Sequence, residues 1–212
     1  MADWSTISAF ATGAGTLVLA MATFASVRSA NRAARTAERA LQVGLRPLLS
    51  HSRFDDPMQK IVWMDRHWAR LEGGRAHVET ADGVIYLAMS LRNAGNGIAV
   101  LHGWVPITEL VAARERGPDE PDAFRRLSRD EYVAAGDTGF FQGAIRDADD
   151  DAFEPLLQVM TDREPFAIDV LYSDHEGGQR SIARFTVVPW GDDGAWTCSV
   201  ARHWNIDRDD PR

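Results

Sequence analysis

The chain has 212 residues, 31 of them acidic and 23 basic, and a formal net charge of −8. This balance argues against nucleic-acid binding, because affinity for phosphate comes from basic contacts. The single cysteine, Cys198, excludes an intrachain disulfide, and the sequence holds no nucleophile elbow, phosphate loop or dinucleotide fingerprint.

The first predicted element is an apolar helix over residues 7–27, a stretch of 21 positions without a charged residue. A bilayer core of about 30 Å takes about 20 apolar residues in a helix. A soluble helix of this length usually carries a polar stripe. A cleaved signal peptide begins with a basic segment, whereas MADWST holds only Asp3. We therefore predict a retained transmembrane helix in contact with the lipid bilayer.

The flanks of this helix predict its orientation. No Lys or Arg precedes it, and five arginines follow it up to Arg46. Under the positive-inside rule, the C-terminal side lies in the cytoplasm. The sequence predicts a single-pass protein of the cell membrane with its N-terminus outside and its C-terminal domain cytoplasmic, and one unpaired cysteine suits that reducing compartment.

The helix is expected to continue past the membrane as a basic juxtamembrane segment to about Val43. Ala and Arg favour a helix, and Gly44 and Pro47 end it. Four arginines recur at spacings of 4, 3 and 4 on one stripe: Arg28, Arg32, Arg35 and Arg39. Two interpretations stay open. The stripe contacts anionic lipid headgroups or an acidic partner, or it only sets topology and solvates one face.

Small residues four apart within the apolar stretch, Ala9 with Gly13 and Ala11 with Gly15, allow close helix–helix approach. Self-association through the membrane helix is therefore a further possibility. Charge separates this region from the rest of the chain, since 29 acidic and 18 basic residues follow Arg46, a net charge of −11. An anionic membrane surface would repel such a domain.

From Pro47 the hydrophobic period becomes two, which is typical of strands. Residues 112–131 are charged and contain prolines, and we expect a loop or short helix outside the core. One short helix is predicted over residues 152–160. The predicted strands cover residues 60–68, 76–80, 84–92, 98–105, 138–145, 166–173, 181–188 and 196–203.

These elements predict a mainly β protein in which an antiparallel β-sandwich follows the N-terminal helix. Residues 1–46 form the transmembrane and juxtamembrane helix. Residues 47–206 form the sandwich domain with one short helix, and residues 207–212 form a polar tail.

Three segments carry a resemblance: LRNAGNGIAV at 91–100, AAGDTGFF at 134–141 and IDVLYSDHEGGQRSIARF at 168–185. The first has the N-x-G-x-G-x-A pattern, and together they resemble the immunoglobulin-like β-sandwich of uncharacterised bacterial single-pass membrane proteins. The resemblance implies an immunoglobulin-like fold and a membrane setting. It implies no catalytic residues.

Two acidic patterns could suggest chemistry. Asp137-Thr138-Gly139 is the triplet of aspartic proteases, but that chemistry needs two carboxylates, so we interpret it as a turn entering a strand. The acidic run 147–151 lacks the Gly and Glu that a calcium-binding loop requires. We interpret it as acids before a helix N-terminus.

The remaining candidates also have structural interpretations. Residues 174–176, Asp-His-Glu, read as a solvated hairpin tip, and the other histidines are dispersed without HxH or HxxxH spacing. Cys198 alternates with core-type residues. Among the seven tryptophans, Trp204 is expected to be partly exposed and to offer an interaction surface. No catalytic residue, cofactor or metal ligand is assigned.

The sequence favours a non-enzymatic, membrane-anchored protein whose sandwich acts as a protein-interaction, accessory or regulatory module. Its expected contact surfaces are residues 112–131 and the arginine stripe. A membrane-tethered hydrolase whose site is supplied by Asp137 or by the Asp- and His-rich turns is one alternative. An envelope-facing ligand sensor, which requires the reversed topology, is the other.

Overall fold

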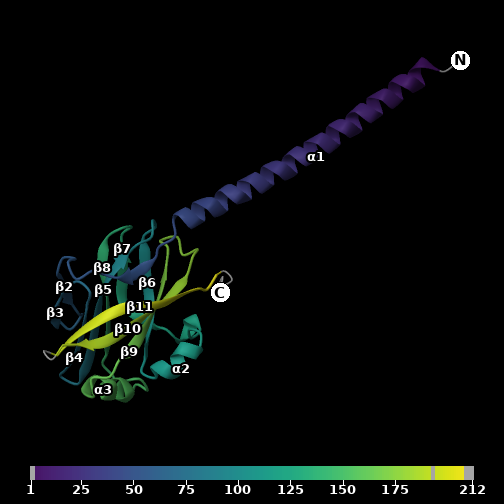
Figure 1. The fold of residues 1–212 in the computed structure, drawn as a ribbon. Coiled ribbons are helices and arrows are strands. Elements are labelled where there is room, and N and C mark those ends of the chain that lie inside the picture. The colour runs from purple at the N-terminus through teal and green to yellow at the C-terminus, as the bar shows by residue number, and fades with distance from the viewer. Residues whose placement is uncertain (1–2, 192–193, 208–212) are drawn as a thin grey trace. The chain divides into compact units, whose positions relative to one another are not determined.

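The computed structural model describes residues 3–191 and 194–207 (Figure 1). The chain divides into two compact units, residues 1–44 and 45–212. The first is helical and the second, called the β-domain below, is built mainly of strands. Of the predicted polar tail at 207–212, only Asp207 lies within the described residues.

The N-terminal unit is one helix, α1 (Trp4–Gly44), about 60 Å long at 1.5 Å per residue. It is exposed from Ser8 onward. The hydroxyls of Thr12, Thr16 and Thr23 donate to carbonyl oxygens one turn earlier, at 2.8–2.9 Å. These polar groups are thus satisfied within the helix, as a bilayer requires. In the described part of the chain, α1 is the one helix long and apolar enough to span a membrane.

Nine strands of the β-domain form one antiparallel sheet. Eight of them follow the order β1-β5-β4-β11-β10-β9-β6-β7, and the ninth, β8, also pairs with β5. The strands are β1 (Leu49–His51), β4 (Arg75–Ala81), β5 (Val84–Asn93), β6 (Ala99–Ile107), β7 (Arg125–Val133), β8 (Thr138–Ile145), β9 (Phe166–Ser173), β10 (Ser181–Trp190) and β11 (Ala195–Asn205).

The sheet curls so that β7 and β8 come close together. β7 ends the hydrogen-bonded order and β8 pairs with β5 near its other end, yet a Cβ on Gly139 of β8 would lie 2.6 Å from Cγ2 of Val133 of β7. The curled sheet surrounds one main core. Four alternating residues of β5 are fully buried in it: Ile85, Leu87, Met89 and Leu91. Helix α3 (Phe153–Thr161) contributes Phe153, Leu156 and Val159 to the same core.

A separate hairpin, β2 (Gln59–Val62) and β3 (Trp68–Leu71), covers the outer face of β5 and β8. Its Ile61, Trp63 and Leu71 pack with Tyr86 of β5 in a second apolar cluster. The indole N–H of Trp63 donates to the carbonyl of Gly143 at 3.0 Å. β5 is therefore covered on both faces, which is why nearly all of its residues are buried.

The expected mainly β fold after one long N-terminal helix is confirmed. The immunoglobulin-like sandwich is not, because the main strands belong to a single curled sheet. One local prediction is wrong and another is right only in part. Residues 60–68 are not one strand, since the chain turns at 64–66 between β2 and β3. Residues 112–131 include the end of α2 (Leu110–Glu115) and the short 3-10 helix η1 (Pro121–Ala123), as the expected short helix allows, but they also hold most of β7, which was not predicted.

The buried Asn93 fixes the start of the β-domain. Its side-chain oxygen accepts from the backbone N–H of Leu48 at 3.1 Å and of Gly95 at 3.0 Å, and its amide donates to the carbonyls of Gly97 and Val133. A Cβ on Gly97 would lie 1.7 Å from the carbonyl oxygen of Leu45. The glycines of the N-x-G-x-G pattern are thus needed for close backbone approach.

Candidate functional site

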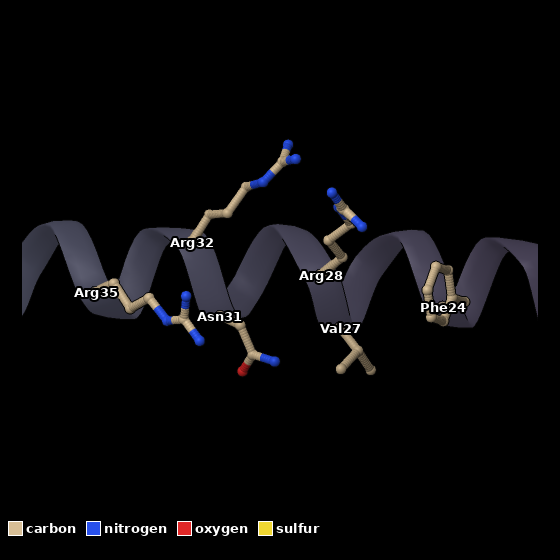
Figure 2. Close-up of a pocket in the computed structure, with 6 residues that line it drawn as sticks. All are labelled: Phe24, Val27, Arg28, Asn31, Arg32 and Arg35. Carbon is tan, nitrogen blue, oxygen red and sulfur yellow. The ribbon is translucent and has the colours of Figure 1, made fainter.

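The four arginines predicted to contact lipid or a partner lie on α1 directly after its apolar part. All four are exposed: Arg28, Arg32, Arg35 and Arg39. At 3.6 residues per turn they fall within an arc of about 60°. Figure 2 shows Arg28 and Arg32 projecting from the same side of the helix, one turn apart. Phe24 is exposed one turn before Arg28, so apolar and cationic side chains adjoin on α1.

The acidic patterns have structural roles. Asp137 lies in the turn before β8, where its carboxylate accepts from the backbone N–H of Thr138 at 2.8 Å. Asp147 accepts from the backbone N–H of Asp149 in the turn that precedes α3. Asp174 is buried and accepts from Gly178 N–H at 2.8 Å. All three segments form turns, and the acidic run precedes α3 as predicted. The hairpin tip is not fully solvated, however, because Asp174 is buried.

Cys198 lies where the sequence predicts, whereas Trp204 does not. Burial raises the pKa of Cys198 to about 12, and the thiol lies in the main core as expected. The expected partial exposure of Trp204 is wrong, since it is 7% exposed. The register of β10 and β11 shifts after Arg184, so a bulge in β11 turns Trp204 away from the main core. There Phe124, Leu171 and Ile182 cover it.

Sequence reasoning missed a cluster of three side chains, His67, His77 and Glu79, which we call the His–Glu cluster. Oε2 of Glu79 lies 3.0 Å from Nε2 of His67 and 2.9 Å from Nε2 of His77. Among the described residues, this is the one group of three or more His, Cys, Asp or Glu side chains whose potential ligand atoms converge. The His77-x-Glu79 spacing places two members on one face of β4. His67, just before β3, comes from the hairpin.

Neighbouring groups hold the His–Glu cluster in place. The His67 ring stacks on Tyr86, with centroids 4.0 Å apart and planes 13° apart. Asp65 accepts from the Tyr86 hydroxyl at 2.8 Å and from the backbone N–H of His67 at 3.1 Å. Desolvation lowers the pKa of His77 against the opposing effect of Glu79. Desolvation thus favours the neutral His77 imidazole.

A buried ion pair lies on the outer face of the sheet. Arg184 of β10 donates two hydrogen bonds of 2.7 Å to the carboxylate of Asp169 on β9. It also donates to the carbonyl of Ala113 in α2, and its guanidinium lies 4.8 Å from the Trp204 ring centroid. The side chains of Asp169 and Arg184 are 1% and 8% exposed. Arg184 thus links α2 to the sheet through its hydrogen bond to Ala113.

Glu131 on β7 makes stability depend on pH. Burial raises its pKa from 4.5 to about 7. Arg129 opposes this rise only in part, with its Nε 3.6 Å from Oε1 of Glu131. The unfolded chain loses this proton near pH 4.5, whereas the folded chain keeps it until about pH 7. The free energy of unfolding should therefore fall by about 3 kcal/mol as pH rises from 4.5 to above 7.

Glu131→Gln should remove this contribution. The free energy of unfolding of the variant should therefore rise relative to that of the wild type as pH rises. Urea unfolding of both proteins at pH 5 and pH 8 measures the difference. Exposed Glu164→Gln is the control and should keep the wild-type pH dependence. An unchanged pH dependence in Glu131→Gln would contradict the assignment.

Part of the predicted contact segment 112–131 lines a surface hollow of about 420 Å³. His102 on β6 forms one wall and hydrogen-bonds to the Ser173 hydroxyl at 2.7 Å. Charged side chains of both signs surround it: Asp122, Arg126 and Asp130. The hollow is a polar surface feature of the β-domain.

No protein-family model matches the chain, and no curated protein or solved structure matches it significantly. Function is therefore inferred from the geometry of the chain's own residues.

Proposed function

We infer that the chain is a single-pass protein of the cell membrane, anchored by α1 with its N-terminus outside and its β-domain in the cytoplasm. The observation that carries this is the exposed apolar part of α1, followed at once by the arginine stripe. In water, such an apolar surface would be unfavourable. In a bilayer it is favourable, and the arginines then lie at the cytoplasmic headgroups.

The arginine stripe contacts anionic lipid. Each basic side chain near an anionic leaflet contributes about 1 kcal/mol of attraction. The segment after Arg46 carries a net charge of −11, and the same leaflet repels it. Because the leaflet attracts the basic stripe and repels the acidic β-domain, the β-domain is favoured to stay away from the lipid surface. It is then available to contact other proteins.

The β-domain then serves as a non-enzymatic interaction or accessory module. Its acidic candidates act as turn residues, and Cys198 is buried with its pKa raised. The hollow lined by residues 121–130 offers mixed charge at the surface. Mixed charge of this kind favours selective recognition of a complementary protein partner.

Moving the positive charge across the span should invert the protein. Arg28, Arg32, Arg35 and Arg39 are replaced by Gln, and Ala2 and Ser5 by Arg. A C-terminal tag, protected from added protease in sealed wild-type cells, should then become accessible in most molecules, because the basic flank sets orientation. Replacing the four arginines by Lys is the matched control and should keep the tag protected. An accessible tag in the wild type would overturn the topology and favour an envelope-facing sensor.

Partner capture tests the interaction role. The tagged full chain is purified in mild detergent, with a variant in which Asp122, Arg126 and Asp130 are changed to Ala as comparison. A stoichiometric membrane partner that the variant loses would support the module. A partner retained by the variant would exclude this hollow as the contact.

A further inference from the structure

We propose that the His–Glu cluster, His67, His77 and Glu79, binds one divalent transition-metal ion, with zinc as the metal that this ligand set fits best. Two imidazoles and one carboxylate are common protein ligands of zinc. Hard ions such as Mg²⁺ and Ca²⁺ prefer sites made of oxygen alone. The proposal is independent of the membrane topology.

The ligand atoms already converge. All of them lie within 4.8 Å of one another, and the two contacts to Oε2 of Glu79 are 2.9 and 3.0 Å. Zinc binds imidazole nitrogen and carboxylate oxygen at about 2.0–2.2 Å, so tetrahedral ligand atoms lie about 3.3 Å apart. An ion at the centre therefore needs only a small outward movement of side chains.

The hydrogen bonds of the metal-free state do not compete strongly with a metal. Each Nε2 now donates to a single carboxylate oxygen, and a neutral imidazole can move its proton to Nδ1 and so present Nε2 as a ligand. Two imidazoles and one carboxylate then supply one negative charge against the two positive charges of the ion.

The surroundings match a zinc site with an open position. Stacking on Tyr86 and the backbone bond to Asp65 orient His67 before any metal arrives. The three side chains are 24%, 22% and 41% exposed, so an ion can enter and water can complete the coordination. Because His67 precedes β3 and His77 lies in β4, the ion would join the hairpin to the main sheet.

The test uses the full chain, purified in mild detergent and stripped with chelator. Equilibrium dialysis with Zn²⁺ should give one ion per chain, and Co²⁺ should produce visible absorption bands that Zn²⁺ abolishes. His77→Ala and Glu79→Gln should each weaken Zn²⁺ binding at least tenfold. Exposed His175→Ala is the matched control and should bind as the wild type does.

Thermal unfolding separates a lost site from a lost fold. Zn²⁺ should raise the Tm of the wild type and of His175→Ala, and at the same Zn²⁺ concentration it should raise the Tm of Glu79→Gln by less. Glu79→Gln keeps an oxygen that can accept from both imidazoles, so its metal-free Tm should stay near that of the wild type. Absence of bound Zn²⁺ in the wild type, or wild-type affinity for Zn²⁺ in both Glu79→Gln and His77→Ala, would overturn the proposal.

Discussion

Replacing Arg184 with Met is expected to lower the free energy of unfolding by about 3–5 kcal/mol, because Asp169 is left buried without its counter-charge. Both hydrogen bonds to Asp169 and the bond to the carbonyl of Ala113 are lost. Methionine keeps much of the volume beside Trp204, so the effect reports charge and hydrogen bonding more than packing. Urea unfolding followed by tryptophan fluorescence measures it.

The double variant Arg184→Met/Asp169→Leu distinguishes the unpaired charge from other causes. Replacing both members of a buried pair by apolar side chains is often neutral, so the double variant should recover most of the lost stability. Arg180→Met is the matched control. Its partner Asp207 is 30% exposed, and loss of such a surface pair should change stability by less than about 1 kcal/mol. Equal effects of Arg184→Met and Arg180→Met would contradict the assignment.

Asn93→Ala is expected to lower the free energy of unfolding by roughly 3 kcal/mol. The amide satisfies four backbone groups of three separate segments, and an unsatisfied buried group costs about 1–3 kcal/mol. The segment that joins α1 to the β-domain should loosen first. Limited proteolysis near residues 45–48 and thermal unfolding measure these two effects.

Asn96→Ala is the matched control in the same turn, because Asn96 is exposed and only its backbone N–H bonds to Arg46. It should change stability by less than about 0.5 kcal/mol. Gly97→Ala should act like Asn93→Ala, since its Cβ would meet the carbonyl of Leu45. Cleavage that is unchanged in both Asn93→Ala and Gly97→Ala would show that this turn does not hold the segment.

Much of the fold could be predicted where the sequence has a strong local pattern. The apolar run and the Ala- and Arg-rich continuation predict one helix, and α1 spans Trp4–Gly44. Alternation in residues 84–92 predicts a core strand, and β5 has that register. β7 was missed because its sequence, RRLSRDEYV, is charged. It lies at one end of the hydrogen-bonded order, where outward side chains meet water and charge is tolerated.

Several elements depend only on short-range physics and can be read from neighbouring residues. These are the apolar helix with its arginine stripe, the alternating strands, the turns at Asp137 and Asp174, and the core position of Cys198. Each follows from periodicity, backbone propensity or hydrophobicity over a few neighbouring residues.

Which distant groups meet depends on how the whole chain packs. The curled sheet, the burial of Trp204, the Arg184–Asp169 pair and the His–Glu cluster all depend on the order and register in which strands pair. Strand pairing joins residues far apart along the chain, and one bulge reverses the face that a side chain occupies. The sequence around a charged or aromatic residue does not indicate which residue it will contact in the fold. His67 and Glu79 therefore come together only when the hairpin packs on the sheet.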